Sequence, residues 1–204
     1  MKVVFTVITN NYDTLKEPVV SEGWQYVCFS DRFMESDVWE CIVTAREQRF
    51  IKIKYYRELL GRKRKGVSLY IDGSFEIIGD LNEFIKEAPT WFSMRKHPGR
   101  DCTFKEAKAV ISIKGMSPAL VEQQMERYKD LPKNWGLAET GIMLRGLADR
   151  KVKAVCDLWW TEYKKGVPRD QLSVMIAFYR LGMRPYLIPN EVVCKYFKEH
   201  KHSK

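Results

Sequence analysis

The chain has 204 residues, carries a formal net charge of +9 at pH 7, and is 45% hydrophobic. This length suits one large domain or two small ones, and the apolar share excludes intrinsic disorder. No stretch reaches the roughly 18 to 20 apolar residues of a membrane span. Five widely spaced cysteines and three histidines argue against a disulfide scaffold or a zinc site.

The positive charge is concentrated in two segments. Residues 46–65 contain nine basic side chains and two acidic ones, a net charge of +7, whereas residues 195–204 contribute +3 and all other residues together −1. Basic segments suggest an anionic partner such as nucleic acid, phosphate or a membrane surface. A solvated helix face and a frayed terminus would give the same pattern.

In the first half, apolar and β-branched runs predict three buried strands, at residues 2–9, 24–30 and 67–71. The first of these runs continues into turn residues without a cleavage site, so we interpret it as a strand and not as a signal peptide. Between the second and third strands, residues 44–60 have the periodicity of a helix, and Gly61 is a plausible C-cap.

The second half alternates in the same way. Strands are predicted at residues 90–94, 140–144 and 186–188, and helices at 118–128, 148–164 and 171–180, with Ser117 as an N-cap. Strands that alternate with helices predict an α/β fold with a mostly parallel central sheet flanked by helices. We expect a single domain over residues 1–190, followed by a basic tail at 191–204.

Ligands of open α/β sheets bind beyond the carboxyl ends of the strands. Three segments follow the predicted strands there, namely Thr9–Asp13, Ser30-Asp31 and Asp72-Gly73-Ser74. An aspartate and a glycine after a buried strand suit a cation site that a phosphate approaches closely, although an ordinary Asp-Gly turn has the same sequence.

The predicted basic helix leads directly into the strand that ends at Asp72. Arg49 and Lys52 are three residues apart and share one helix face. Two cations beside an aspartate can hold a diphosphate. The run Arg62–Lys65 is interpreted as solvated, or alternatively as a contact to a polyanionic acceptor.

An ordered set of motifs extends over most of the chain. It comprises Asn11-Tyr12-Asp13, Leu15 with Glu17-Pro18, Gly23-Trp24 to Asp31, Arg49 with Lys52, Ile71-Asp72-Gly73-Ser74, His97-Pro98 with Arg100 and Cys102, Gly136-Leu137 with Glu139 and Gly141 to Arg145, Trp159-Trp160, and Arg169 to Ser173. Over roughly residues 3 to 180 this set resembles the glycosyltransferase-like domain of the plant TOD/MUCI type and its bacterial relatives.

The resemblance implies a GT-A-like domain that binds a nucleotide-sugar donor, most often a UDP-sugar. Such enzymes use an Asp-x-Asp motif to bind a divalent metal and the donor diphosphate, whereas this chain has Asp72-Gly73-Ser74 and lacks the second carboxylate. Asp72 would bind Mn²⁺ or Mg²⁺ alone, or Arg49 and Lys52 would neutralise the diphosphate without a metal. Thr9, Tyr12 and Asp13 would then face the base and ribose.

The resemblance also suggests roles for later residues. Asp170 and Gln171 are predicted as catalytic or sugar-contacting, with a helix N-cap as the plain alternative for Asp170. His97 and Arg100 are candidates for donor contact, although a lone histidine is more often structural. Trp135, Gly136, Glu139 and Arg169 are candidates for contact with the acceptor or a sugar, since tryptophan rings stack on pyranose faces.

We therefore expect a soluble, cytoplasmic glycosyltransferase that acts on a glycan or a cell-surface polysaccharide precursor. One alternative is a transferase that glycosylates modified bases of phage DNA, which would contact the basic segments. Another is a non-enzymatic nucleic-acid-binding module, but the chain has no recognisable motif of that class. A nucleoside-diphosphate thermal-shift panel would separate enzyme from module.

Overall fold

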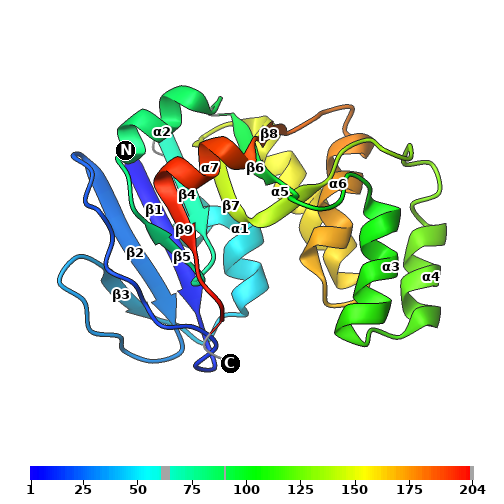
Figure 1. The fold of residues 1–204 in the computed structure, drawn as a ribbon, viewed down its shortest axis with the longest axis horizontal. Helices are drawn as coiled ribbons and strands as arrows, with labels where there is room; N and C mark the ends of the chain where they lie inside the picture. The colour runs from blue at the N-terminus through cyan, green and yellow to red at the C-terminus, as the bar shows by residue number, and fades with distance from the viewer. Residues whose placement is uncertain (61–64, 90, 203–204) are drawn as a thin grey trace.

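The computed structural model describes residues 1–60, 65–89 and 91–202, without the side chains of residues 56–60. Its centre is a seven-stranded sheet with the order β3-β2-β1-β4-β7-β6-β8 (Figure 1). The strands are β1 (Lys2–Ile8), β2 (Trp24–Ser30), β3 (Glu40–Val43), β4 (Gly66–Ile71), β6 (Phe92–Lys96), β7 (Ala138–Leu147) and β8 (Tyr186–Ile188). Only β7 pairs antiparallel with its neighbours, β4 and β6, in this sheet.

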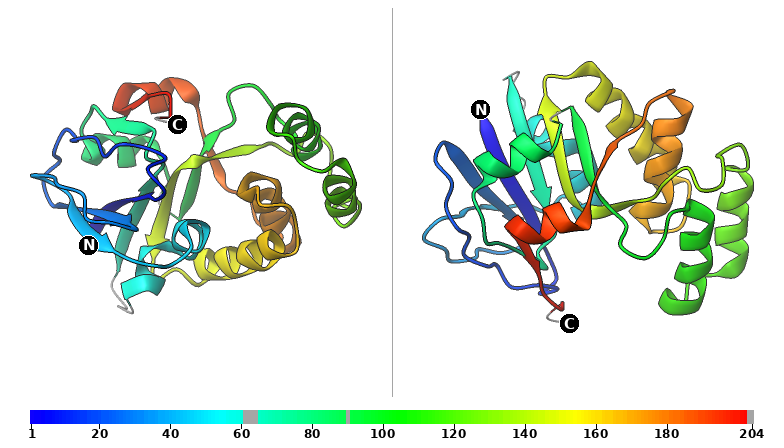
Figure 2. Two further views of the ribbon diagram at one scale, coloured as in Figure 1. Left: turned by 90° about the horizontal axis from the view of Figure 1, so that it is seen from below. Right: turned by 45° about the horizontal axis from the view of Figure 1, so that its top comes forward.

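Helices cover both faces of the sheet (Figure 2). One face carries α1 (Gln48–Leu60), α5 (Arg150–Lys164) and α6 (Asp170–Arg180), and the other carries α2 (Leu81–Glu87) and α7 (Asn190–Tyr196). The antiparallel pair α3 (Thr103–Lys114) and α4 (Pro118–Glu126) lies beside α6. This mixed α/β architecture, with one domain and a mostly parallel sheet, confirms the predicted fold class.

Side-chain alternation along the strands divides the interior into two cores. Val3, Phe5 and Val7 of β1 pack beneath α1, α5 and α6, whereas Val4 and Ile8 pack on the α2 and α7 side. Successive side chains of a strand point to opposite faces, so a strand covered on both faces is apolar throughout. That is why β1, β2 and β4 could be recognised as uninterrupted apolar runs.

Helix α1 is not continuous. It begins at Gln48 rather than at the predicted Thr44, and Tyr55 interrupts it with φ 46° and ψ 160°. Positive φ is uncommon for a residue with a side chain and costs energy unless the surroundings impose it. The predicted C-cap Gly61 and residues 62–64 of the basic run lie outside the described residues.

The segment after residue 190, expected as a basic tail, is folded through its last strand. It forms α7 and then β9 (Phe197–Glu199), which pairs antiparallel with β5 (Phe75–Ile77) in a separate two-stranded sheet. Phe197 is buried and packs edge-on against Phe84 of α2 at 4.9 Å. None of the described helices has the length and apolar character needed to cross a bilayer.

Candidate functional site

Strands β1 to β4 all end at the same edge of the sheet, because they run parallel. The turns that follow them line a cavity of about 250 Å³ together with the first turn of α1, the end of α3 and the segment before α6. Its lining residues are Tyr12, Asp13, Gln48, Arg49, Asp72, Gly73, Lys114, Arg169 and His202. Three of these are basic, Arg49, Lys114 and Arg169, and two are acidic, Asp13 and Asp72, so the lining has an excess of positive charge that suits an anion.

A second hollow of about 380 Å³ shares Gln48 and Arg49 with the first one and therefore adjoins it. It is bounded by Thr9, Asn10, Asp31 and residues 44–49. The loop here is held by a hydrogen bond from the Asn10 amide to Asp31 Oδ2 of 2.8 Å. The two hollows form one polar groove along the carboxyl edge, where ligands of such sheets bind.

Lys52 lies beneath this groove, and only 1% of it is exposed. Its ammonium is 3.3 Å from Asp72 Oδ1 and 3.0 Å from Asp170 Oδ2, and it donates to Thr140 Oγ1 at 3.1 Å. The Tyr70 hydroxyl donates to the same Asp72 oxygen. Lys52 therefore joins two carboxylates from distant parts of the chain, instead of lining the cavity as the sequence suggested.

Asp170 is the first residue of α6, where Arg169 is the N-cap and makes no side-chain capping bond. Its Oδ1 accepts from the Gln171 amide at 3.0 Å, and its Oδ2 accepts from Thr140 and faces Lys52 and Arg49. Burial opposes ionisation, but Lys52 and Arg49 outweigh it and hold the pKa of Asp170 well below its usual range. The carboxylate is thus charged, buried and occupied by its partners.

Glu139 on β7 has weaker cationic partners than Asp170, the nearest being Arg95, whose Nη1 lies 3.7 Å from Glu139 Oε2. The Glu139 side chain is 21% exposed, and Oε2 has no hydrogen-bond partner among the described residues, while Oε1 accepts from the Gly141 amide at 2.7 Å. Burial, and after it the negative charge of Asp72, raise the pKa of Glu139 to about 7 against the opposing effect of Lys52 and Arg95. A carboxyl with this pKa can exchange a proton near neutral pH.

Gly73 allows the two main turns of the site to touch. A Cβ at this position would lie 2.9 Å from both Asp13 Cβ and Ile8 Cγ1. The glycine therefore packs against the Asp13 turn and does not hold space open for a phosphate. Asp13 in turn lies 3.1 Å from Nδ1 of His202, whose ring lies 4.6 Å from that of Tyr12.

His97 and Arg100 do not line the cavity, and Arg100 is linked to the cavity residue Arg169 through the carboxylate of Glu106. Glu106 of α3 is buried, and its two oxygens pair with Arg100 at 2.6 Å and with Arg169 at 3.2 Å. The His97 Nδ1 atom accepts from the Gly99 and Arg100 amides. Burial and then Arg100 lower the pKa of His97. This network fixes Arg169 at the cavity wall.

The predicted site residues are therefore brought together in part. The groove and its supports include Thr9, Tyr12, Asp13, Arg49, Lys52, Asp72, Gly73, Arg169, Asp170 and Gln171. Ser74 is buried behind the turn, and its carbonyl oxygen accepts from His200. Trp135 packs between Tyr179 and Arg184, and Gly136 bonds to Asp101, so neither lines the groove.

Several groups at the site were not predicted. Gln48, Lys114 and His202 line the cavity, and Tyr70 and Thr140 support the carboxylates. Gln48 had a signal, since it precedes Arg49 at the start of a predicted helix. Lys114 and His202 had none, because α3 was not predicted and the C-terminal segment was interpreted by its charge alone.

The side chains here do not form a closed metal site. Across the described residues, no group of three or more His, Cys, Asp or Glu side chains is placed to hold an ion. Asp72 is the nearest candidate ligand, but its Oδ1 already accepts from Tyr70 and Lys52. A metal here would need most of its ligands from the substrate.

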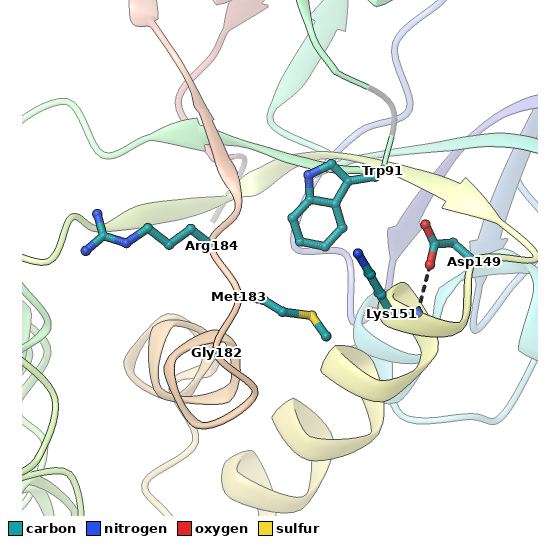
Figure 3. Close-up of a pocket in the computed structure, with 6 residues that line it drawn as sticks. All are labelled: Trp91, Asp149, Lys151, Gly182, Met183 and Arg184. Carbon is teal, nitrogen blue, oxygen red and sulfur yellow. Dashed lines mark hydrogen bonds between the residues drawn. The ribbon is translucent and has the colours of Figure 1, made fainter.

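A separate hollow of about 400 Å³ lies at the opposite edge of the sheet. Trp91, Met183 and Lys151 converge on it, Arg184 points away, and Asp149 accepts from the Lys151 amide at 2.7 Å (Figure 3). Asp149 caps α5 in this way. We assign this hollow no part in the site described above.

A mixed α/β domain with a cationic groove at its strand ends is typical of enzymes that bind phosphate-bearing substrates. Comparison with protein families matches residues 63–202 to the TOD1/MUCI70, glycosyltransferase-like domain. The chain belongs to this family, which confirms the resemblance seen in its motifs. No curated protein matches the chain.

Proposed function

We propose that the protein transfers a sugar from a nucleotide-sugar donor, with the diphosphate bound in the cavity beside Arg49. The observation that supports this most is the position of Arg49, which lines both hollows and whose side chain is 29% exposed. The Asp170 carboxylate is the main cause that raises the pKa of Arg49, and it outweighs the opposing effect of burial. Arg49 is therefore always charged. Family membership supports a glycosyltransferase independently of the groove.

The remaining cavity cations complete the proposed diphosphate site. Arg169 and Lys114 face the same cavity from the side of α6 and α3. Guanidinium groups bind phosphate oxygens in a bidentate manner. The nucleoside would then occupy the adjoining hollow, where Thr9 and Asp31 offer hydrogen-bonding groups, and the Tyr12 ring lines the neighbouring cavity. As the resemblance implies, we expect the donor to be a UDP-sugar.

The two acidic candidates fit different tasks. Transfer of a sugar to a hydroxyl needs a base to accept the hydroxyl proton. Glu139 lines neither hollow, but its raised pKa and its Oε2, which accepts no hydrogen bond from the described residues, suit that task better than Asp170, whose oxygens are both occupied. We propose that Asp170 and Gln171 orient Lys52 and Arg169, because Gln171 Oε1 accepts from Arg169 at 3.1 Å.

The acceptor and the metal belong to the same proposal. We expect a glycan acceptor and a cytoplasmic location, as the sequence suggested. Mn²⁺ or Mg²⁺ would be held by Asp72 together with donor oxygens, which is how Mg²⁺ commonly binds nucleotides. Without a metal, Arg49 and Arg169 would supply the positive charge for the leaving diphosphate.

Nucleotide binding and donor turnover test this function. UDP and GDP, each with EDTA or with Mn²⁺, should raise the melting temperature of the wild-type protein, because a ligand bound only to the folded state stabilises it. Arg49→Met should weaken UDP binding about tenfold or more, since it removes a charge-assisted contact. Arg150→Met, at an exposed arginine that starts α5, is the matched control and should bind normally.

Asp72→Asn should abolish hydrolysis of a UDP- or GDP-sugar panel while the protein remains folded. Asp130→Asn, an exposed residue remote from the groove, should turn over like wild type. The proposal fails if neither nucleotide shifts the melting temperature with or without Mn²⁺. It fails equally if Asp72→Asn retains full turnover.

A further inference from the structure

Arg145 of β7 is the largest charged side chain that is completely buried in the described part of the chain. Its exposed fraction is 0%, and it points into the core beneath α1, α5 and α6. Among the described residues it makes no ion pair with a carboxylate, and its Nε and Nη2 have no hydrogen-bond partner. A buried cation without a counter-ion is costly, so its placement requires an explanation.

The contacts of Arg145 lead directly to the break in α1. Its Nη1 donates to the carbonyl oxygens of Lys52 at 2.9 Å and Ile53 at 3.3 Å. In an unbroken helix these carbonyls would accept from residues 56 and 57, but Tyr55 departs from helical geometry between them. Arg145 therefore caps the carboxyl end of the first part of α1, where the helix dipole favours a cation.

Aromatic rings provide the rest of the environment of the guanidinium. Its central carbon lies 5.6 Å from the ring centroids of Phe5 and Tyr55 and 5.9 Å from that of Phe92. Cations bind the faces of aromatic rings, and more strongly when desolvated. Burial lowers the pKa of Arg145, but arginine stays protonated in proteins.

Lys52, whose carbonyl oxygen Arg145 caps, also holds the two carboxylates beneath the groove. Lys52 offers its carbonyl to Arg145 on one side and its ammonium to Asp72 and Asp170 on the other. We propose that Arg145 is a positioning residue, which holds the end of this helical segment so that the Lys52 ammonium stays between the two carboxylates. Among the described residues, the hydrogen bonds of Arg145 go to Lys52, Ile53 and Cys156 and to no residue that lines the groove.

A double-mutant cycle on UDP binding tests this role. Arg145→Met and Lys52→Met should each weaken UDP binding by about tenfold, and the double variant should be no weaker than Lys52→Met alone. Arg145→Lys, which keeps a cation at the carbonyls, should recover much of the loss. Val155→Ala, a buried change in the same core, should lower the melting temperature and leave UDP affinity intact. Additive losses, or normal binding by Arg145→Met, would overturn the proposal.

A second measurement does not rest on the proposed function. Native labelling with an amine-acylating reagent, read by mass spectrometry, should leave Lys52 protected in the wild type and in Val155→Ala. The same residue should become labelled in Arg145→Met and in a milder Arg145→Gln variant, at temperatures where both are folded. Equal protection of Lys52 in all variants contradicts the inference, whether or not the wild type binds a nucleotide.

Discussion

Asp170 and Glu139, two acidic residues near Asp72 and Lys52, have different electrostatic surroundings. Asp170 is surrounded by cations and is charged, whereas Glu139 is half-buried beside the negative Asp72 and has a pKa of about 7. Pairs of acids whose environments separate their pKa values commonly divide the catalytic work between them. In the proposed mechanism Asp170 keeps a fixed negative charge and Glu139 exchanges the proton.

Activity should therefore depend on the ionisation of Glu139. If Glu139 is the base, kcat/KM for sugar transfer rises with pH and levels off above about 7. Glu139→Gln should lower kcat by about a hundredfold or more and remove this dependence, with UDP affinity nearly unchanged. A Glu139→Gln enzyme that keeps the wild-type pH profile would show that another group accepts the proton.

The free energy of unfolding should also depend on the ionisation of Glu139, but it should decrease as pH rises, whereas activity should increase. The folded protein binds a proton at Glu139 that the unfolded chain releases near the ordinary glutamate pKa of 4.5. The contribution of this group to the free energy of unfolding therefore decreases as pH rises from about 4.5 to about 7. Chemical denaturation of wild type and Glu139→Gln over this range measures the difference.

At the scale of elements, close contact between two turns shapes the groove. The turn after β4 packs against the turn after β1 because residue 73 has no side chain. Gly73→Ala should force Asp13 or Ile8 to move, cost about 1 to 3 kcal/mol of unfolding free energy, and weaken UDP binding. Gly99→Ala is a suitable control, because its Cβ would meet nothing within 4 Å. Unchanged UDP affinity in Gly73→Ala would show that the turns are not coupled to the groove.

The elements that could be predicted share one property, a local pattern. β1, β2 and β4 are continuous apolar runs, and α5 places Val152, Val155 and Trp159 on one buried stripe. The helices α2, α3 and α7 and the strands β3, β5 and β9 were not predicted. β5 and β9 have three residues each and exist only because they pair with each other across more than a hundred residues.

The same distinction applies to the site. Arg49 and Asp72 could be predicted from helix spacing and strand ends, which are local features. The break at Tyr55 could not, because the side chain that caps the helical segment before it is Arg145, 90 residues further along the chain. Nor could the near-neutral pKa of Glu139, which depends on burial and on the charge of Asp72.

At the scale of the whole molecule, several lysines of the described residues form ion pairs with nearby carboxylates. Lys105 pairs with Asp101, Lys129 with Glu126, and Lys195 with Glu87, while Lys54 and Lys153 share Asp157. Exposed pairs of this kind add little stability, but they place negative charge beside positive charge on the surface. The cavity of about 250 Å³ that Arg49 and Arg169 line suits a small anionic group better than a long polyanion.

Binding to duplex DNA should accordingly be weak at physiological salt. Anisotropy of a labelled duplex between 50 and 200 mM salt measures this directly, since a DNA-binding surface with many phosphate contacts loses about a thousandfold or more in affinity over that range. We expect micromolar or weaker binding, and sugar transfer to a glycan at either salt concentration. Tight, steeply salt-dependent binding together with transfer to a modified base would instead make DNA the acceptor.

The first and last described parts of the chain lie at opposite edges of the sheet (Figure 1). Met1 precedes β1, and its amino group donates to the Lys65 carbonyl at 3.0 Å, whereas His202 lines the cavity beside Asp13. A sensor surface or resin attached ahead of residue 1 would therefore leave the groove facing the bulk solution. Attachment behind residue 204 would crowd the groove and pull on β9, so immobilisation chemistry alone can change an apparent affinity.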